Sequence, residues 1–233
     1  MTAVAIIVEH QTPDLLTLCL ASLRRFAPSV IPRVVIGSWW GEGARAHAAG
    51  IEHARNTNMA GDAETVIFLD TDVVILSDAW LPYIYKQLSL GAATGGLRHR
   101  GDVTQLYCQG KLLLHAHCLA MTRELFQATP HFSANGILDT AYLVTLTAQA
   151  FGGTTAIIPQ SGEGWPSRVG LYAEGSILWA HLGRGTSFRP RGPWRERLRR
   201  VAARVGSPRA RKILSYQQDR QEFLRKGWEI VRA

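Results

Sequence analysis

Cysteine is scarce in this sequence, and no apolar run is long enough to cross a membrane. The three cysteines, Cys19, Cys108 and Cys118, are odd in number and lie among apolar residues, which argues against a disulfide framework and against a zinc site. We expect them to be reduced core thiols of a cytosolic protein. Glu9 ends the first apolar run and no basic leader precedes it, so neither a signal peptide nor a membrane span is expected.

Internal repeats and low-complexity tracts are also absent. The 233 residues, 46% apolar and 19% charged, are typical of one soluble globular domain with room for a short appendage. The net charge of +8 is unevenly placed, because residues 184–233 carry +11 and residues 1–183 carry −3. Basicity is therefore a property of the C-terminal segment and not of the body.

An apolar run that ends in two carboxylates organises the chain. Residues 66–69, Val-Ile-Phe-Leu, are typical of a buried parallel strand, and Asp70 and Asp72 follow at its end. Ligands of open α/β sheets bind beyond the carboxyl ends of the strands, so we expect these carboxylates to face a divalent cation that bridges to a diphosphate. The alternative is that both aspartates only cap the turn into the next segment.

Strands and helices alternate in the first part of the chain. Strand-like runs at residues 4–8, 34–36 and 66–69 are separated by two helical patterns. One starts at Pro13, and the other opens at residues 41–43 and runs to about Asn58. This order predicts an α/β fold with a mostly parallel central sheet and helices on both faces.

The later elements are predicted from shorter patterns. A helix begins at Ser77 and ends between residues 91 and 96, residues 101–114 are strand-like, and residues 117–121 are apolar. A short helix begins at Thr122, and Asp139 and Thr140 cap a helix that ends at residues 152–153. A strand at 154–158, a polar glycine-rich loop at 161–175 and a last strand at 177–181 follow, and the last strand ends in His181.

The basic C-terminal segment contains an amphipathic helical pattern. Apolar residues recur at helical spacing among arginines, at Trp194, Leu198, Val201 and Val205. Such a helix suits an anionic membrane surface. The same stripe could instead pack on the preceding domain, with Arg189 or Arg191 toward the phosphates of a ligand. A nucleic acid is a third alternative, because the charge would attract its backbone, although no base-reading motif accompanies it.

Five motifs occur in a recognisable order: residues 7–16 (Ile-Val-Glu-His-Gln-Thr-Pro-Asp-Leu-Leu), residues 43–54, residues 68–72 (Phe-Leu-Asp-Thr-Asp), residues 138–140 (Leu-Asp-Thr) and residues 181–187 (His-Leu-Gly-Arg-Gly-Thr-Ser). Together, from residue 4 to about residue 188, they resemble the GT-A glycosyltransferases of family 2. The resemblance implies a GT-A-like nucleotide-diphospho-sugar transferase domain at residues 1–188, followed by a basic helical extension at residues 189–233.

The resemblance also implies roles for individual residues in a metal-dependent, inverting glycosyltransferase. Contacts to a nucleotide-sugar donor are implied for Val8, Glu9, His10, Gln11, Ser38, Arg45, His47, Asp70 and Thr71. Asp70, Asp72 and His181 would hold Mn²⁺ or Mg²⁺, and Asp139 would be the general base that takes the proton of an acceptor hydroxyl. The implied acceptor is a lipid-linked molecule or a polysaccharide, in preference to a nucleic acid. The implied location is cytoplasmic, with peripheral contact at the inner face of the membrane.

The sequence departs from the family after the second strand, where an aspartate is usual. Gly37, Ser38, Trp39 and Trp40 stand there instead, so the identity of the donor base is open. Ser38 could hydrogen-bond a base edge, and the tryptophans could stack on the base or belong to the core. His10 and Gln11 replace the more usual Tyr and Asn.

Each of these roles has a structural alternative. Asp139 could be an ordinary helix cap, His181 a core histidine, and Arg45 and His47 members of a solvated helix face. The Asp70-Thr71-Asp72-Val73-Val74 stretch also fits haloacid-dehalogenase-type phosphatases, in which the first aspartate is a nucleophile. That class needs a later lysine and an acidic pair; Lys86 and Lys111 are the lysines available before the basic tail, and no second acidic pair appears. A non-catalytic nucleotide-sugar-binding scaffold is the other alternative.

Overall fold

A strand that is buried along its whole length lies inside the main sheet. The computed structural model describes residues 1–37, 43–97, 114–132, 141–157, 159–160, 164–166, 169–183 and 193–233. β1 (Ala3–Glu9) is buried at all seven positions and pairs in parallel with β2 (Val30–Ile36) on one side and with β3 (Thr65–Asp70) on the other. A strand covered on both faces needs apolar side chains at successive positions, which explains the continuous apolar runs of β1 and β3.

The main sheet has the strand order β2-β1-β3-β6-β5-β7 and is mostly parallel, as predicted. β6 (Leu114–Thr122) is antiparallel to both of its neighbours, β3 and β5 (Ala93–Leu97), and β7 (Thr154–Ile157) is parallel to β5. β2 forms one edge, where Pro32 is tolerated because an edge strand can leave one ladder hydrogen bond unmade.

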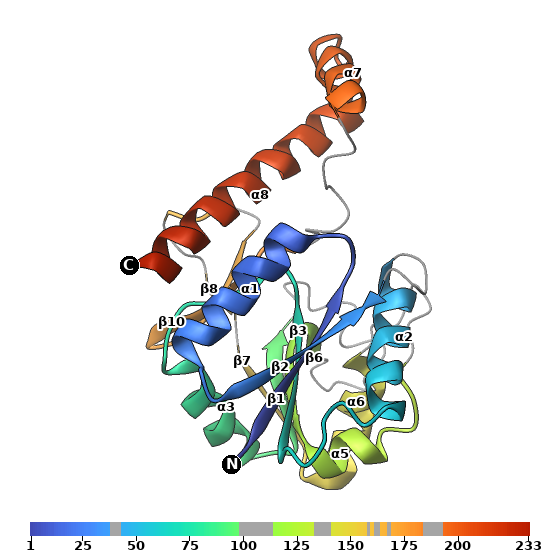
Figure 1. The fold of residues 1–233 in the computed structure, drawn as a ribbon, viewed down its shortest axis with the longest axis vertical. Coiled ribbons are helices and arrows are strands. Elements are labelled where there is room, and N and C mark those ends of the chain that lie inside the picture. Colours follow the sequence, from blue (N-terminus) through green and yellow to red (C-terminus); the bar gives the residue numbers. More distant parts are fainter. Residues whose placement is uncertain are drawn as a thin grey trace.

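Helices cover both faces of this sheet (Figure 1). Val4 and Ile6 of β1 pack in one core cluster with residues of α2 (Gly43–Asn56), α5 (Arg123–Ala128) and α6 (Ala141–Ala148), which the 3₁₀ turn η2 (Gln149–Phe151) extends. Ala5 and Ile7 pack in the opposite cluster with α1 (Pro13–Phe26) and α3 (Trp80–Leu88). The alternation of side chains along one strand therefore joins the two halves of the core.

A second, smaller antiparallel sheet brings the end of the body to the main sheet. Its strand order is β4 (Val73–Ile75), β10 (Ser176–His181), β9 (Gly170–Glu174) and β8 (Pro159–Gln160). β4 starts directly after the Asp70-Thr71-Asp72 turn, and His181 pairs with Val73. The Leu182 N–H also donates to the Asp72 carbonyl oxygen at 3.1 Å. Two segments more than a hundred residues apart thus meet at the end of β3.

Two sequence predictions about secondary structure are wrong. The helix expected to end between residues 91 and 96 ends at Leu88, and β5 follows it. β5 is glycine-rich because it is crowded: a Cβ on Gly95 would lie 2.9 Å from the Cys118 carbonyl oxygen, and one on Gly96 would lie 2.5 Å from the Tyr172 ring. The loop expected at 161–175 contains β9, of which residues 171–173 are buried. Both strands were missed because their glycines resemble those of loops. In β5 the glycines permit close packing and do not mark turns.

Two of the three cysteines are buried free thiols, as expected. Burial raises the pKa of the Cys118 thiol to about 12 and raises that of Cys19 further. A thiol that is both enclosed and protonated at neutral pH is a poor nucleophile, so these cysteines serve packing. Cys108 lies outside the described residues.

The C-terminal segment divides into two helices with different environments, α7 (Pro193–Arg204) and α8 (Pro208–Arg232). α8 lies along α1 (Figure 1) and contributes the fully buried Phe223 to a core cluster with Leu15 and Leu18. Arg220 also donates to the Asp14 carboxylate at 2.6 Å. α8 is therefore part of the core of the body, while the predicted domain boundary at residue 188 lies outside the described residues. None of the described helices combines the length and apolar character that a membrane span requires.

We expect Phe223→Ala to lower the free energy of unfolding by about 3–5 kcal/mol, because it empties a closed site between α8 and α1. Phe223→Leu is the matched control and should cost less than about 1.5 kcal/mol, since it keeps most of the volume. Urea unfolding followed by circular dichroism measures both. Equal, small losses in the two variants would mean that α8 is not needed for the fold.

Candidate active site

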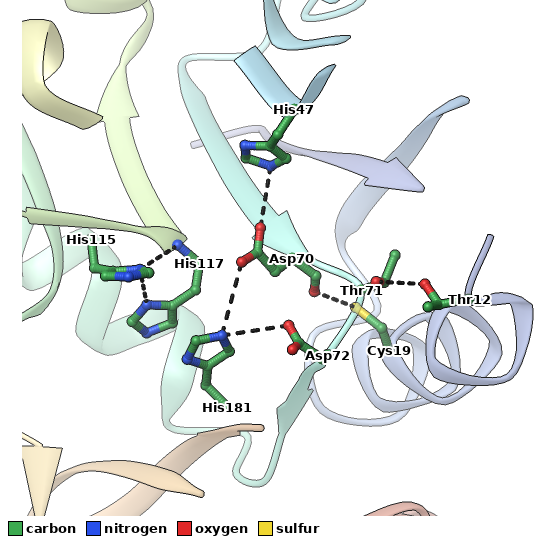
Figure 2. Close-up of polar contacts among 9 residues, drawn as sticks. All are labelled: Thr12, Cys19, His47, Asp70, Thr71, Asp72, His115, His117 and His181. Atoms are coloured by element: carbon green, nitrogen blue, oxygen red, sulfur yellow. Dashed lines mark hydrogen bonds and ion pairs between the residues drawn. The ribbon is translucent and has the colours of Figure 1, made fainter. Parts of the chain in front are cut away.

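The turn between β3 and β4 carries the two aspartates. Asp70 is the last residue of β3, beside Val8 of β1, and Asp72 is nearly buried just before β4. The buried Thr71 between them forms a hydroxyl–hydroxyl hydrogen bond of 3.0 Å with Thr12 (Figure 2). The Thr12 N–H in turn donates to Glu9 Oε1 at 2.5 Å. The turn is thus fixed to the junction between β1 and α1, which sets the position of both carboxylates.

His181 completes a candidate metal site with these aspartates. Its Nε2 lies 3.4 Å from Asp72 Oδ1 and 3.9 Å from Asp70 Oδ2 (Figure 2). One ligand atom from each of the three residues falls within 4.8 Å of the others. Ligands at about 2.1–2.6 Å from one ion lie no more than about 5 Å apart, so the spacing fits a single cation. Two carboxylates and one imidazole suit a divalent ion such as Mn²⁺.

The other oxygen of Asp70 is held from the opposite side. His47, on α2, donates from Nε2 to Asp70 Oδ1 at 3.2 Å, so the carboxylate lies between two imidazoles (Figure 2). Burial by itself would raise the pKa of Asp70, but the hydrogen bond from His47 and the charges of His47 and His181 outweigh it and hold that pKa below its usual value. The carboxylate is therefore ionised at neutral pH and ready to act as a ligand.

Two histidines at the start of β6 also belong to the site, and no prediction included them. The fully buried His117 ring stacks on the His181 ring, with centroids 4.1 Å apart and planes 3° from parallel. Its Nδ1 lies 2.7 Å from His115 Nδ1 in a hydrogen bond (Figure 2). Burial, with the charges of His181 and His115, lowers the pKa of His117 well below its usual value, so its ring is neutral. His117 is thus an uncharged flat support for His181.

A signal for these two histidines was present in the sequence. His115 and His117 are two residues apart, and residues at that spacing on a strand share one face. The pairing of β6 with β3, in which Cys118 lies opposite Leu69, brings that face beside Asp70. The pairing itself cannot be read from local sequence, and the apolar residues that follow His117 are typical of a core segment.

The remaining predicted donor residues lie around this centre at different depths. Val8 is buried, and Cβ atoms on Gly37 and Gly50 would lie 2.6 Å and 2.7 Å from its Cγ1, so its side chain packs against α2. The His10 ring lies 6.2 Å from the His47 ring. Gln11 is exposed and has a positive φ of 57°, and Arg45 is exposed on α2.

The predicted base contact, Ser38, and the predicted general base, Asp139, lie outside the described residues, as do Trp39, Trp40 and Arg184. The geometry therefore brings together the predicted metal ligands and His47, and the roles of the other residues stay predictions.

Comparisons with known proteins place the fold. No family profile matches the sequence, and no curated protein matches it. The mannosyltransferase PcManGT from Pyrobaculum calidifontis, solved with GDP-Man and Mn²⁺, is similar in structure with a TM-score of 0.50 and 14% identity, over 97% of this chain and 85% of that chain. A197 from STIV gives a TM-score of 0.47 at 14% identity, over 76% of this chain and 93% of that one. Glucosyl-3-phosphoglycerate synthase from Mycobacterium tuberculosis gives a TM-score of 0.44 at 14% identity, over 89% of this chain and 80% of that one.

The likeness to the mannosyltransferase extends over nearly the whole chain. It shows the fold: this protein has the GT-A-type α/β fold of nucleotide-sugar transferases, as the order of its motifs predicts. Membership in family 2 stays a prediction.

We expect Mn²⁺ alone to raise the melting temperature, because an ion that binds only the native state stabilises it, by about 2.7 kcal/mol at a hundredfold excess over its dissociation constant. Asp72→Asn should abolish most of the shift, since it removes a charged ligand at nearly constant shape. Asp62→Asn is the control, because that carboxylate is fully exposed and remote from the turn. An unchanged shift in Asp72→Asn would place the ion elsewhere.

Proposed function

We propose that this protein is a metal-dependent glycosyltransferase that moves a sugar from a nucleotide-diphosphate donor to an acceptor hydroxyl. The observation that carries the proposal is the Asp70, Asp72 and His181 group at the carboxyl end of β3, inside a GT-A-type fold. Ligands of open α/β sheets bind at this edge. The structurally similar mannosyltransferase PcManGT was solved with a nucleotide-sugar and Mn²⁺, which supports a donor and an ion of this kind here.

The charges of the site explain why donor and metal would bind together. Asp70 and Asp72 are both negative, and a donor diphosphate would be repelled by them unless a cation lay between. A bound divalent ion would supply that positive charge and stabilise the leaving diphosphate. His47 holds one oxygen of Asp70 and leaves the other toward Asp72 and His181. The stacked His117 fixes the plane of the His181 ring, so the ligand set is arranged before the donor arrives.

The remaining parts of the reaction are proposed from the sequence. The β1 end from Val8 to Gln11, with Ser38 and Arg45, would contact the nucleotide and the phosphates. Asp139 would deprotonate the acceptor hydroxyl for a single, inverting displacement. A lipid-linked or polysaccharide acceptor is the class proposed, in preference to a nucleic acid. The GT-A-type fold favours a transferase over a dehalogenase-type phosphatase. Transfer of the sugar to an acceptor is the property that would distinguish an enzyme from a non-catalytic donor-binding scaffold.

We expect Asp70→Ala and Asp72→Ala to abolish metal-dependent donor binding, because either change leaves the diphosphate charge uncompensated. Calorimetric titration of a panel of nucleotide-sugars, with and without Mn²⁺, measures the affinity, and Asp62→Ala serves as the control. Undiminished Mn²⁺-dependent binding in Asp72→Ala would rule out this site. A generic phosphomonoester should not be hydrolysed by the native protein, and turnover of it would favour the phosphatase alternative.

We expect Asp139→Asn to keep donor affinity but to lower the rate of transfer at least about 100-fold, because the amide cannot accept the proton of the acceptor. The measurement pairs donor titration with the initial rate of glycosyl transfer, and Asp62→Asn should match the native protein in both. An equal loss of donor affinity would make Asp139 a binding residue. A native protein that binds the donor and transfers to no acceptor would be a scaffold.

A further inference from the structure

The apolar stripe on α7 is exposed. Among the described residues, nine large apolar side chains are exposed, and four of them lie within twelve residues of one another: Trp194 at 67%, Leu198 at 50%, Val201 at 50% and Val205 at 80%. The other five lie on the body, and no more than two of them, Leu90 and Phe151, line the same pocket. Single exposed apolar residues are ordinary, whereas a contiguous group indicates a surface that meets another apolar phase.

The four residues form one continuous line. At 100° per residue, their positions fall within an arc of about 60° on the helix. Val205 lies just beyond the end of α7, but its N–H still donates to the Val201 carbonyl oxygen at 3.1 Å, so the helical path continues to the last member of the stripe. A sharp turn follows at Gly206, which has a φ of 101°, and Ser207 caps α8. The stripe therefore runs the length of α7 and stops at the turn into α8.

The stripe is exposed, which contradicts its predicted packing on the body, while Arg189 and Arg191 of that alternative lie outside the described residues. α8 joins the core through Phe223, and α7 extends from its far end, away from the sheets (Figure 1). Contact between the two helices includes the Arg211 guanidinium, which donates to the Ala203 carbonyl oxygen at 3.1 Å. α7 is thus held by α8 while its apolar line faces outward.

Positive charge surrounds the stripe. Residues 193–212 contain eight Lys or Arg and one acidic residue, a net charge of +7. Exposed cations lie both on α7 and at the start of α8: Arg197, Arg200, Arg204, Arg209, Arg211 and Lys212. An outward apolar line among cations matches a surface with an apolar interior and anionic headgroups. A nucleic acid would match the charge but leave the apolar line in water, and a second copy would bring two like-charged helices together.

We propose that α7 is an interfacial docking helix for an anionic lipid bilayer. Its apolar stripe enters the boundary between headgroups and acyl chains, its arginines lie among the headgroups, and α8 transmits that attachment to the body through α1. This inference goes beyond the proposed function and does not depend on it.

The test uses the full chain, because deletion of everything after Phe188 would also remove the buried Phe223. Co-sedimentation is measured with vesicles of phosphatidylglycerol and phosphatidylcholine, and with phosphatidylcholine alone, at low and high salt. We expect binding to the anionic vesicles that falls at high salt, since salt screens the attraction. The double variant Leu198→Ser/Val201→Ser should bind at least about tenfold more weakly, because it removes apolar area and leaves the charge unchanged.

Leu90→Ser is the matched control, because Leu90 is 66% exposed on the body and should not affect vesicle binding. Equal binding of the double variant and the native protein would overturn the proposal, as would equal binding to neutral vesicles. Tighter binding to duplex DNA than to anionic vesicles would assign the surface to nucleic acid. A dimer in light scattering that the double variant loses, without vesicle binding, would assign it to a second copy. Donor titration of the double variant reports separately on the active site.

Discussion

Two negative charges at the end of a buried strand are the constraint on which the site depends. Asp70 and Asp72 are close together, Asp72 is only 5% exposed and the side chain of Asp70 is 29% exposed, so neither charge is fully hydrated. His47 approaches Asp70 from α2, and His181 approaches both carboxylates from the second sheet. The path of the chain after β3 brings His181 to the two carboxylates, because β4 pairs with β10, the strand that carries His181.

The parts of the fold that were predictable are those in which local sequence and burial agree. β1 and β3 are covered on both faces, so their apolar runs are continuous and indicate the parallel sheet directly. The D-x-D turn and the late histidine were predicted as metal ligands, and the structure brings their side chains together. β5 and β9 were missed because their glycine content resembles that of loops. His115 and His117 were missed because their role depends on the pairing of β6 with β3, which no local pattern specifies.

The C-terminal segment shows the same limit of sequence reasoning. Its arginines make residues 189–233 look like one basic extension, yet α8 buries Phe223 and α7 exposes its apolar stripe. The difference arises from the partner: α8 meets the apolar face of α1, where Asp14 pairs with Arg220. α7 has no comparable face of the described body against it. Hydrophobic periodicity identifies that a helix has an apolar side, and the neighbouring elements decide what that side contacts.

Gly96 of β5 links this crowded packing to the chemistry. A Cβ at that position would lie 2.9 Å from both Cε1 and Nε2 of His117, and the His117 ring is flat against His181. A side chain as small as a methyl group would have to displace the imidazole that supports a metal ligand. The uncharged strand β5 therefore controls how deeply the His181 imidazole sits in the protein, because Gly96 leaves room for the His117 ring behind it.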